Sequence, residues 1–274
     1  MIDSATNEPP FGGPRRPVFG APGVRPDEPA PDPDRPLRGR LAVVTGGAGL
    51  LGAAMAVELG ARGADICLMG HDADELRQTL STLGPDVRSL MLRCDLATGA
   101  DVLAAVDFVS RIDRPVSLLI HAAGLQAPAT IAAGSVESLD EHYLWNVRGP
   151  YLLTQSLMGS LADAAGQVVF FTASETSSNA TAGGDVHHTI SQAGMQAFAS
   201  ELRVEASRLG IRVLTVDAVA QTWSDVSTTA VGPGGTTLMS SLARAVVDTL
   251  VVGGVDVTEL RVQRPSGATR SERR

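Results

Sequence analysis

From residue 40 onward, short apolar segments alternate with longer segments of helical periodicity. The short segments read LAVVTG, ADICLMG, VRSLMLRCD, VSLLIHAAG, QVVFFTAS, IRVLTVDAV and ELRVQRP. Their nearly continuous apolar character is typical of parallel strands covered on both faces, because a strand with one wet face would alternate apolar and polar residues. The pattern therefore predicts a single α/β domain over residues 38–266, a doubly wound parallel sheet flanked by helices.

The two ends of the chain depart from this pattern. Residues 1–37 hold most of the 16 prolines and almost no periodic apolar residues. Such a segment buries too little apolar surface to offset its ordering entropy, so we expect a flexible Pro-rich extension. It is either a bland tail or a docking segment. Residues 267–274 read GATRSERR, and we expect a basic, solvated C-terminal tail.

Charge, hydropathy and cysteine content exclude several classes of function. The net charge of −8 argues against a nucleic-acid partner, which needs a basic face. No uncharged apolar run is long enough to span a bilayer, and the N-terminus lacks the pattern of a signal peptide. The two cysteines, Cys67 and Cys94, lie in apolar segments and form neither a disulfide framework nor a zinc site. We expect a cytoplasmic protein with a small-molecule substrate and no metal.

A cluster of glycines follows the first apolar segment, in LAVVTGGAGLLGAAMAVELGARG. Gly47, Gly49 and Gly52 satisfy G-x-G-x-x-G between an expected strand and an expected helix, and Gly46 precedes them. In this context glycines allow a tight turn and the close approach of a pyrophosphate, to which the helix N-terminus offers free N–H groups. The turn predicts a dinucleotide site, with a packing turn that binds no ligand as the alternative.

With later landmarks this turn resembles the short-chain dehydrogenase/reductase family, over nearly everything after residue 38. TGGAGLLG is similar to the family's T-G-x-x-G-x-x-G, and HAAG to its N-N-A-G, which places Ala123 and Gly124 beside the cofactor. Asp95 occupies the place of the acid that hydrogen-bonds adenine, and Asn146 that of the Asn in the active-site water relay. The resemblance implies a Rossmann-like fold, a nicotinamide cofactor and a homodimer or homotetramer.

The resemblance bears on cofactor preference at the end of the second expected strand. NAD-specific members place an acid there, and NADP-binding members often place an Arg just after it. Here the residues are Gly70 and His71. Absence of the acid favours NADP(H), although a mostly neutral His is a weak phosphate clamp. A surface turn residue is the alternative reading of His71.

The proton-transfer half departs from the family. Where the family has a Tyr and a Lys four residues apart at the start of a helix, HHTISQAG has His188 and Gln192. The family's Lys lowers the pKa of the Tyr, whereas an imidazole with a reference pKa of about 6.5 needs no cationic neighbour. The two changes therefore fit one altered acid–base design. Decay of an unused site, or a role for His187 instead, stays open.

Two further landmarks are altered. A strict alignment puts Ala173 at the place of the family's Ser, with Ser174 one residue later, and we expect Ser174 and Asn146 to orient substrate or water. The family's Pro-Gly turn after the sixth strand is replaced by Ala218 and Val219. The hydroxyl-rich segment that follows is similar to the family's substrate lid or is an ordinary surface loop.

Three functions are compatible with this pattern. The leading hypothesis is a biosynthetic enzyme that performs non-redox acid–base chemistry, such as isomerisation, dehydration or cyclisation of a small apolar metabolite, with NADP(H) structural or absent. The first alternative is an NADP(H)-dependent oxidoreductase that uses His188 in place of the Tyr. The second is a catalytically silent dinucleotide-binding subunit. Ordinary Tyr–Lys carbonyl reductase activity is not expected.

Overall fold

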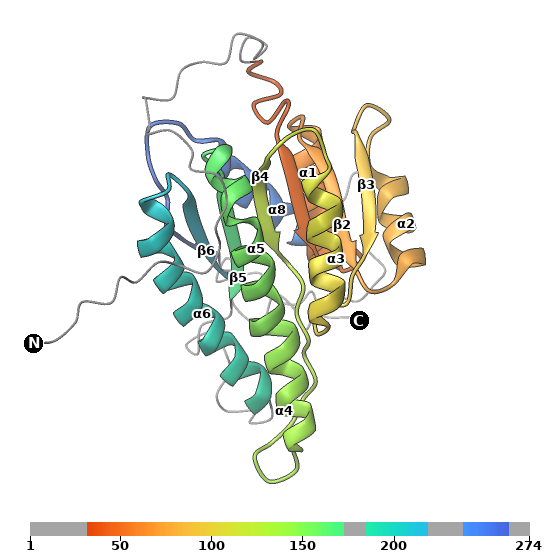
Figure 1. The fold of residues 1–274 in the computed structure, drawn as a ribbon, viewed down its shortest axis with the longest axis vertical. Helices are drawn as coiled ribbons and strands as arrows, with labels where there is room; N and C mark the ends of the chain where they lie inside the picture. The colour runs from red at the N-terminus through yellow and green to blue at the C-terminus, as the bar shows by residue number, and fades with distance from the viewer. Residues whose placement is uncertain (1–31, 173–184, 219–237, 263–274) are drawn as a thin grey trace, which may run out of the picture. The chain divides into compact units, whose positions relative to one another are not determined.

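The computed structural model describes residues 32–172, 185–218 and 238–262, and within them seven strands form one parallel sheet (Figure 1). The strand order is β3-β2-β1-β4-β5-β6-β7. In chain order the strands are β1 (Leu41–Thr45), β2 (Asp65–Gly70), β3 (Ser89–Arg93), β4 (Val116–His121), β5 (Gln167–Thr172), β6 (Arg212–Ala218) and β7 (Glu259–Val262). The predicted doubly wound parallel sheet is therefore confirmed, and each of the seven apolar segments contains one strand.

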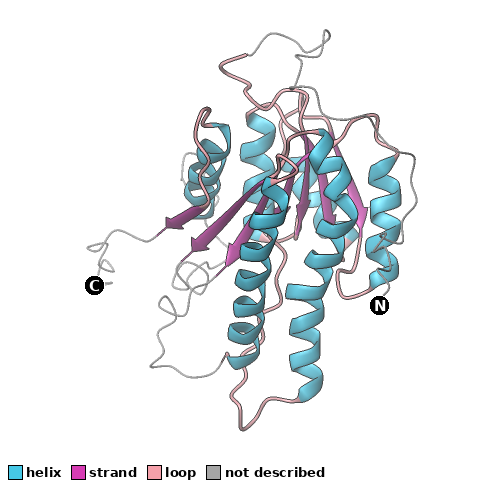
Figure 2. Ribbon diagram, turned by 60° about the vertical axis from the view of Figure 1, so that its left-hand side comes forward, coloured by secondary structure: helices cyan, strands magenta, loops and turns pink. Residues whose placement is uncertain are grey.

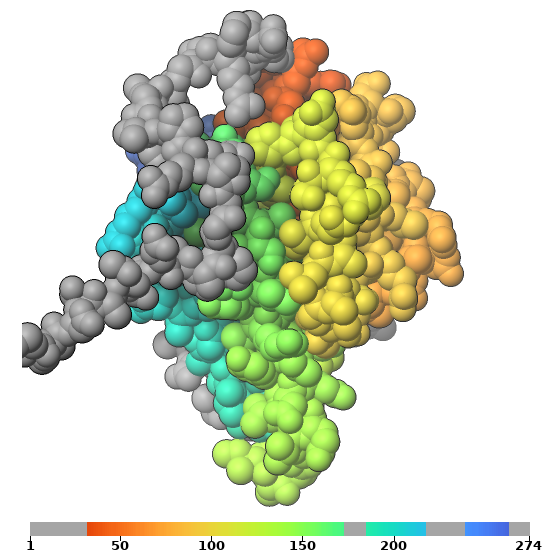
Figure 3. Space-filling view, in the orientation of Figure 1, coloured from red at the N-terminus to blue at the C-terminus, as the bar shows by residue number. Residues whose placement is uncertain are grey.

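Helices cover both faces of the sheet (Figure 2). One face packs against α1 (Leu50–Ala61), α2 (Ala73–Thr82) and α8 (Leu238–Val251), and the other against α3 (Gly99–Ser110), α5 (Gly149–Asp163) and α6 (Val186–Ser207). Figure 3 shows α3 and α5 side by side on the second face. Successive residues of β1 enter opposite apolar layers, Val43 on the α3 side and Val44 on the α1 side. The strands are continuously apolar because both of their faces are buried.

The helical stretch expected after β4 is interrupted in the structure. It divides into α4 (Val136–Tyr143), a π-helical turn η1 (Leu144–Arg148) and α5. Pro150 has no N–H to donate to the carbonyl of Asn146 four residues earlier, so the regular α-helical ladder cannot continue there. Such turns recur at functional sites, and this one places Asn146 with only 1% of its surface exposed.

Backbone packing explains two of the four glycines between β1 and α1. Gly46 has a φ of +67°, and a Cβ there would lie 2.6 Å from the Cα of Ala123. A Cβ on Gly52 would lie 2.1 Å from the carbonyl oxygen of Gly46. These two positions need glycine because other backbone atoms occupy the space of a side chain. Gly49 is less restricted, since its nearest neighbour, the Gly46 oxygen, would be 3.3 Å away.

The described part of the chain shows neither a membrane-spanning helix nor a metal-binding cluster. None of its helices has both the length and the apolar character that crossing a bilayer requires. Across residues 32–172, 185–218 and 238–262, no group of three or more His, Cys, Asp or Glu side chains is placed to hold a metal ion.

Candidate active site

A pocket of about 210 Å³ opens at the carboxyl ends of the central strands. It brings together the turn after β1, the ends of β2 and β3, the loop after β4 and one residue of η1. Its lining residues are Gly46, Ala48, Gly49, Met69, Gly70, His71, Glu75, Cys94, Leu96, Ala122, Ala123, Gly124 and Trp145. Five residues of the predicted dinucleotide site, namely Gly46, Gly49, His71, Ala123 and Gly124, thus meet in one cavity, while Gly47 and Gly52 pack behind it.

The N-terminus of α1 at this pocket has no side-chain cap. Gly49 is the N-cap residue, and the first turn contains no acidic residue. By contrast, α2 is capped by Asp72, whose carboxylate accepts hydrogen bonds from the N–H groups of Asp74 and Glu75. The first N–H groups of an α-helix have no partner within the helix. The first N–H groups of α1 therefore remain available to an anion. The glycine turn also lets a diphosphate approach the backbone closely.

Asp95 makes hydrogen bonds within its own turn, and its predicted contact with adenine stays a prediction. Its carboxylate accepts hydrogen bonds from the N–H of Ala97 at 2.9 Å and from the hydroxyl of Thr98 at 3.5 Å. Asp95 thereby shapes the turn that leads into α3, and the pocket is lined by its neighbours Cys94 and Leu96 instead. Burial, with the nearby acidic residues, raises the pKa of Cys94 to about 11, so its thiol is a poor nucleophile.

Trp145 is a pocket residue that sequence reasoning missed. Its indole meets the ring of the exposed His71 edge to face, with 5.7 Å between ring centroids. The carbonyl of His71 accepts a hydrogen bond from Nε of Arg93 at 3.2 Å. The signal in the sequence is an aromatic residue directly before Asn146, and Trp145 lies within the π-helical turn η1.

The two candidate histidines at the start of α6 have different surroundings. His187 is 6% exposed, and its Nδ1 lies 3.2 Å from the hydroxyl of Ser138. Its ring also lies edge-on to that of the buried His142, with 5.6 Å between centroids. His187 is therefore part of the packing between α4 and α6. His188 is half-buried, with its Nδ1 3.8 Å from Oδ2 of Asp185.

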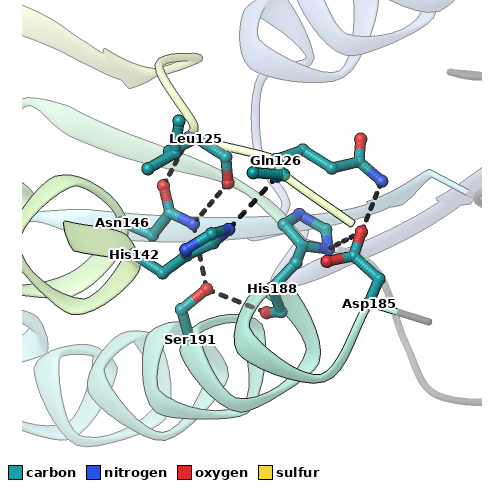
Figure 4. A network of polar contacts seen from close by, with 8 residues as sticks. Leu125, Gln126, His142, Asn146, Asp185, His188 and Ser191 are labelled. Atoms are coloured by element: carbon teal, nitrogen blue, oxygen red, sulfur yellow. Dashed lines mark hydrogen bonds and ion pairs between the residues drawn. The ribbon is translucent and has the colours of Figure 1, made fainter. Parts of the chain in front are cut away.

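Hydrogen bonds join Asn146 to the loop after β4 and to α6 (Figure 4). Its side-chain oxygen accepts from the N–H of Leu125 at 2.6 Å, and its amide donates to the Leu125 carbonyl and to Oγ of Ser191, both at 2.9 Å. The hydroxyl of Ser191 donates to the carbonyl of His188 at 2.8 Å. Asn146 thus acts on His188 by fixing the first turn of α6.

The surroundings of His188 favour its neutral form. Burial lowers the pKa of His188 below the ordinary value, the carboxylate of Asp185 opposes this shift, and the neighbouring His142 adds to it. A neutral imidazole near neutral pH is suited to accept a proton. The structure therefore gives His188 the properties of a base more than those of an acid.

The remaining predicted site residues are described only in part. Gln192 lies on α6 one turn after His188 and is half-buried. Ala218 is the last residue of β6. Ala173, Ser174 and Val219 lie outside the described residues, so the predictions that concern the Ser position and the lid stay predictions.

His121, at the first position of HAAG, is buried at the end of β4. Its Nε2 lies 2.8 Å from the hydroxyl of Thr154, and its ring stacks on Phe170 with 4.9 Å between centroids. Its Nδ1 has no hydrogen-bond partner among the described residues. Burial lowers the pKa of His121 to about 3.

This burial predicts that the protein loses stability in mild acid. Between a reference pKa of about 6.5 and the folded-state pKa of about 3, the unfolded chain binds a proton that folded His121 does not. The free energy of unfolding should therefore fall as pH decreases through this interval, and His121→Asn should make the fall shallower. Urea unfolding at several pH values measures both slopes. An equal pH dependence of the free energy of unfolding in the wild type and in His121→Asn would contradict the lowered pKa of His121.

The family model for short chain dehydrogenases matches residues 40–229. A D-threitol dehydrogenase of Mycolicibacterium smegmatis is 29% identical over 188 residues, which cover 68% of this chain and 71% of the relative. Momilactone A synthase of Oryza sativa subsp. japonica is 31% identical over 182 residues, 65% of each protein. An NADPH-dependent aldehyde reductase-like chloroplastic protein of Arabidopsis thaliana is 29% identical over 163 residues, 53% of this chain and 60% of the relative.

Solved structures share the fold. L-sorbose reductase from Gluconobacter frateurii, complexed with NADPH and L-sorbose, has a TM-score of 0.71 at 19% identity and covers 84% of this chain and 97% of its own. A metagenomic short-chain oxidoreductase in complex with NADP has a TM-score of 0.68 at 23% identity, with coverage of 82% and 97%.

Proposed function

Because this chain belongs to the short chain dehydrogenase family, whose model matches residues 40–229, we propose that it is an NADP(H)-dependent oxidoreductase of small hydroxyl or carbonyl compounds. One observation carries the proposal. Ala123 and Gly124 line the glycine-turn pocket, and the next two residues, Leu125 and Gln126, bond to Asn146 and Asp185 beside His188. A single loop therefore joins the glycine-turn pocket to the surroundings of His188, the proposed base.

The residues of the pocket fit a dinucleotide. The turn at Gly46 and Gly49 and the N-terminus of α1 would hold the diphosphate. His71, Leu96 and Trp145 would line the adenosine half. NADP(H) is favoured because Gly70 stands where NAD-specific members have an acid, and because two structural neighbours were solved with NADP or NADPH. When bound, the cofactor supplies or takes up a hydride.

His188 would exchange the proton of the substrate. In the oxidative direction the neutral imidazole takes the hydroxyl proton while the carbon bearing that hydroxyl loses a hydride, which leaves a carbonyl. In the reductive direction the imidazolium returns the proton. Because burial lowers the pKa of His188, the proton-accepting form prevails near neutral pH.

The comparisons favour this function over the leading sequence hypothesis. Relatives of this chain are named dehydrogenases and reductases, which supports redox chemistry more than isomerisation, dehydration or cyclisation. Non-redox acid–base chemistry remains the second candidate, because His188 and Gln192 stand where the family has Tyr and Lys.

Cofactor turnover separates the two candidates. We expect purified protein, supplied with NADP+ and a panel of small polyols and secondary alcohols, to produce NADPH absorbance at a rate proportional to enzyme concentration. Aldehydes and ketones with NADPH should show the reverse change. Conversion of a substrate without any change in the cofactor would support the non-redox candidate.

A further inference from the structure

Asp185 holds an unusual position at the start of α6. It is the N-cap residue, yet its side chain makes no capping hydrogen bond. Its Oδ2 accepts a hydrogen bond from Nε2 of Gln126 at 2.8 Å and lies 3.8 Å from Nδ1 of His188. Its Oδ1 is buried and has no hydrogen-bond partner among the described residues. A buried carboxylate oxygen without a partner costs free energy, so a helix cap alone does not explain this residue.

The orientation of Asp185 is set from outside its own helix. The N–H of Val186 donates to the carbonyl of Ala129 at 3.0 Å, and Ala129 and Asp185 form an isolated parallel bridge. Gln126, three residues before Ala129, holds the carboxylate itself. The loop after β4 therefore fixes both the backbone and the side chain of Asp185, and the carboxylate faces the imidazole of His188 (Figure 4).

These contacts close a ring of polar groups around the first turn of α6. Gln126 bonds to Asp185, which faces the imidazole of His188. The carbonyl of His188 accepts from Ser191, which accepts from Asn146, and Asn146 bonds to Leu125, the neighbour of Gln126. His188 is thus held both at its ring and at its backbone, from the same loop that lines the dinucleotide pocket.

We propose that Asp185 is a positioning residue for His188, with Gln126 holding Asp185 in turn. An ionised carboxylate accepts hydrogen bonds and donates none, so its charge favours a proton on the ring nitrogen that faces it. Neutral His188 then has its proton on Nδ1, which leaves Nε2 as the acceptor for a substrate proton. The catalytic half of this inference rests on the proposed function, and the pairing itself does not.

The separation of 3.8 Å is an ion-pair contact longer than a hydrogen bond. Catalytic hydrogen bonds are often long in the absence of substrate and shorten in the reactive complex. The other titratable group that acts on His188 is His142, from α4. The ring nitrogens of His142 face the carbonyl of Ser138 and the N–H of Ala127, so neither is turned to His188 as a proton acceptor.

Histidine-selective ¹⁵N NMR tests the pairing without any need for turnover. In the wild-type protein the neutral ring of His188 should carry its proton on Nδ1. Asp185→Ala should move that proton to Nε2, the tautomer that free histidine prefers, and added formate should partly restore Nδ1–H. Ser138→Ala is the matched control, because it removes the partner of neighbouring His187 and should leave the His188 signals unchanged.

Turnover tests the positioning role. Asp185→Ala should lower kcat on the order of 10²-fold with little change in KM, the size expected when a positioned acid–base group loses its orientation. If this variant does not fold, Gln126→Ala should give a smaller tautomer shift of the same sign. The proposal would be overturned if wild-type His188 carried its proton on Nε2. It would also be overturned if Asp185→Ala changed neither the tautomer of His188 nor kcat. A correct tautomer in a protein that neither forms nor consumes NADPH with any compound of the panel would refute the oxidoreductase function alone.

Discussion

Gly49→Asp is expected to abolish dinucleotide binding while the protein stays folded. Gly49 is the N-cap of α1 with extended backbone, φ −79° and ψ 161°, and the nearest atom to an added Cβ would be the Gly46 oxygen at 3.3 Å. Asp is a favourable N-cap residue, so the helix keeps its start. Its carboxylate would occupy the free N–H groups and repel the diphosphate. NADPH should no longer raise the melting temperature, an effect that scales with RT ln(1 + [L]/Kd).

Gly159→Asp is the matched control for this change. It adds the same charge to an exposed position of α5 where no atom lies within 4 Å of an added Cβ. Its NADPH-dependent shift should equal that of the wild type. A full shift in Gly49→Asp, or no shift in the wild type with either NADPH or NADH, would mean that the glycine turn serves packing alone.

His188→Gln is expected to reduce turnover by a factor on the order of 10² to 10⁴, the usual contribution of a positioned acid–base group. The affinity for NADPH should be unchanged, because His188 does not line the pocket. The wild-type pH–rate profile for alcohol oxidation should fall as pH decreases through the pKa of His188. Since burial lowers that pKa, the limb should lie below about 6.5, far from the value of about 10 for a Tyr.

His187→Asn is the control that distinguishes the neighbouring histidines. This residue packs between α4 and α6, with its Nδ1 3.2 Å from Ser138 Oγ. Its replacement should lower the melting temperature and leave the turnover of folded protein close to that of the wild type. A larger loss of turnover in His187→Asn than in His188→Gln would transfer the catalytic role to His187.

The fold could be predicted from the sequence because it depends on local periodicity. Continuously apolar strands alternate with helical segments, and both patterns can be read from one sequence. The break at η1 was not predicted, since the effect of Pro150 depends on a carbonyl four residues earlier and on the approach of Gly149 to Leu96. Trp145, which lines the pocket, lies within this turn.

The site could be predicted only in part. The glycine turn and the pair Ala123–Gly124 are each short local motifs, and they meet because β1 and β4, which they follow, are neighbours in the sheet. Asp185 and Gln126 are separated by 59 positions and meet only through tertiary packing, so no spacing in the sequence indicates their pairing. The roles of Ser174 and Gln192 and the homo-oligomer stay predictions.

Transfer of isotope from cofactor to product tests the oxidoreductase function most directly. Protein is incubated with NADPH that carries deuterium at both hydrogen positions of the reactive carbon of the nicotinamide, together with the carbonyl compound converted fastest, and the product is analysed by mass spectrometry. Hydride transfer predicts one deuterium in each product molecule, bound to the carbon that bore the carbonyl, with one NADPH oxidised per product. A product formed without deuterium, while NADPH remains reduced, would contradict hydride transfer and support the non-redox candidate.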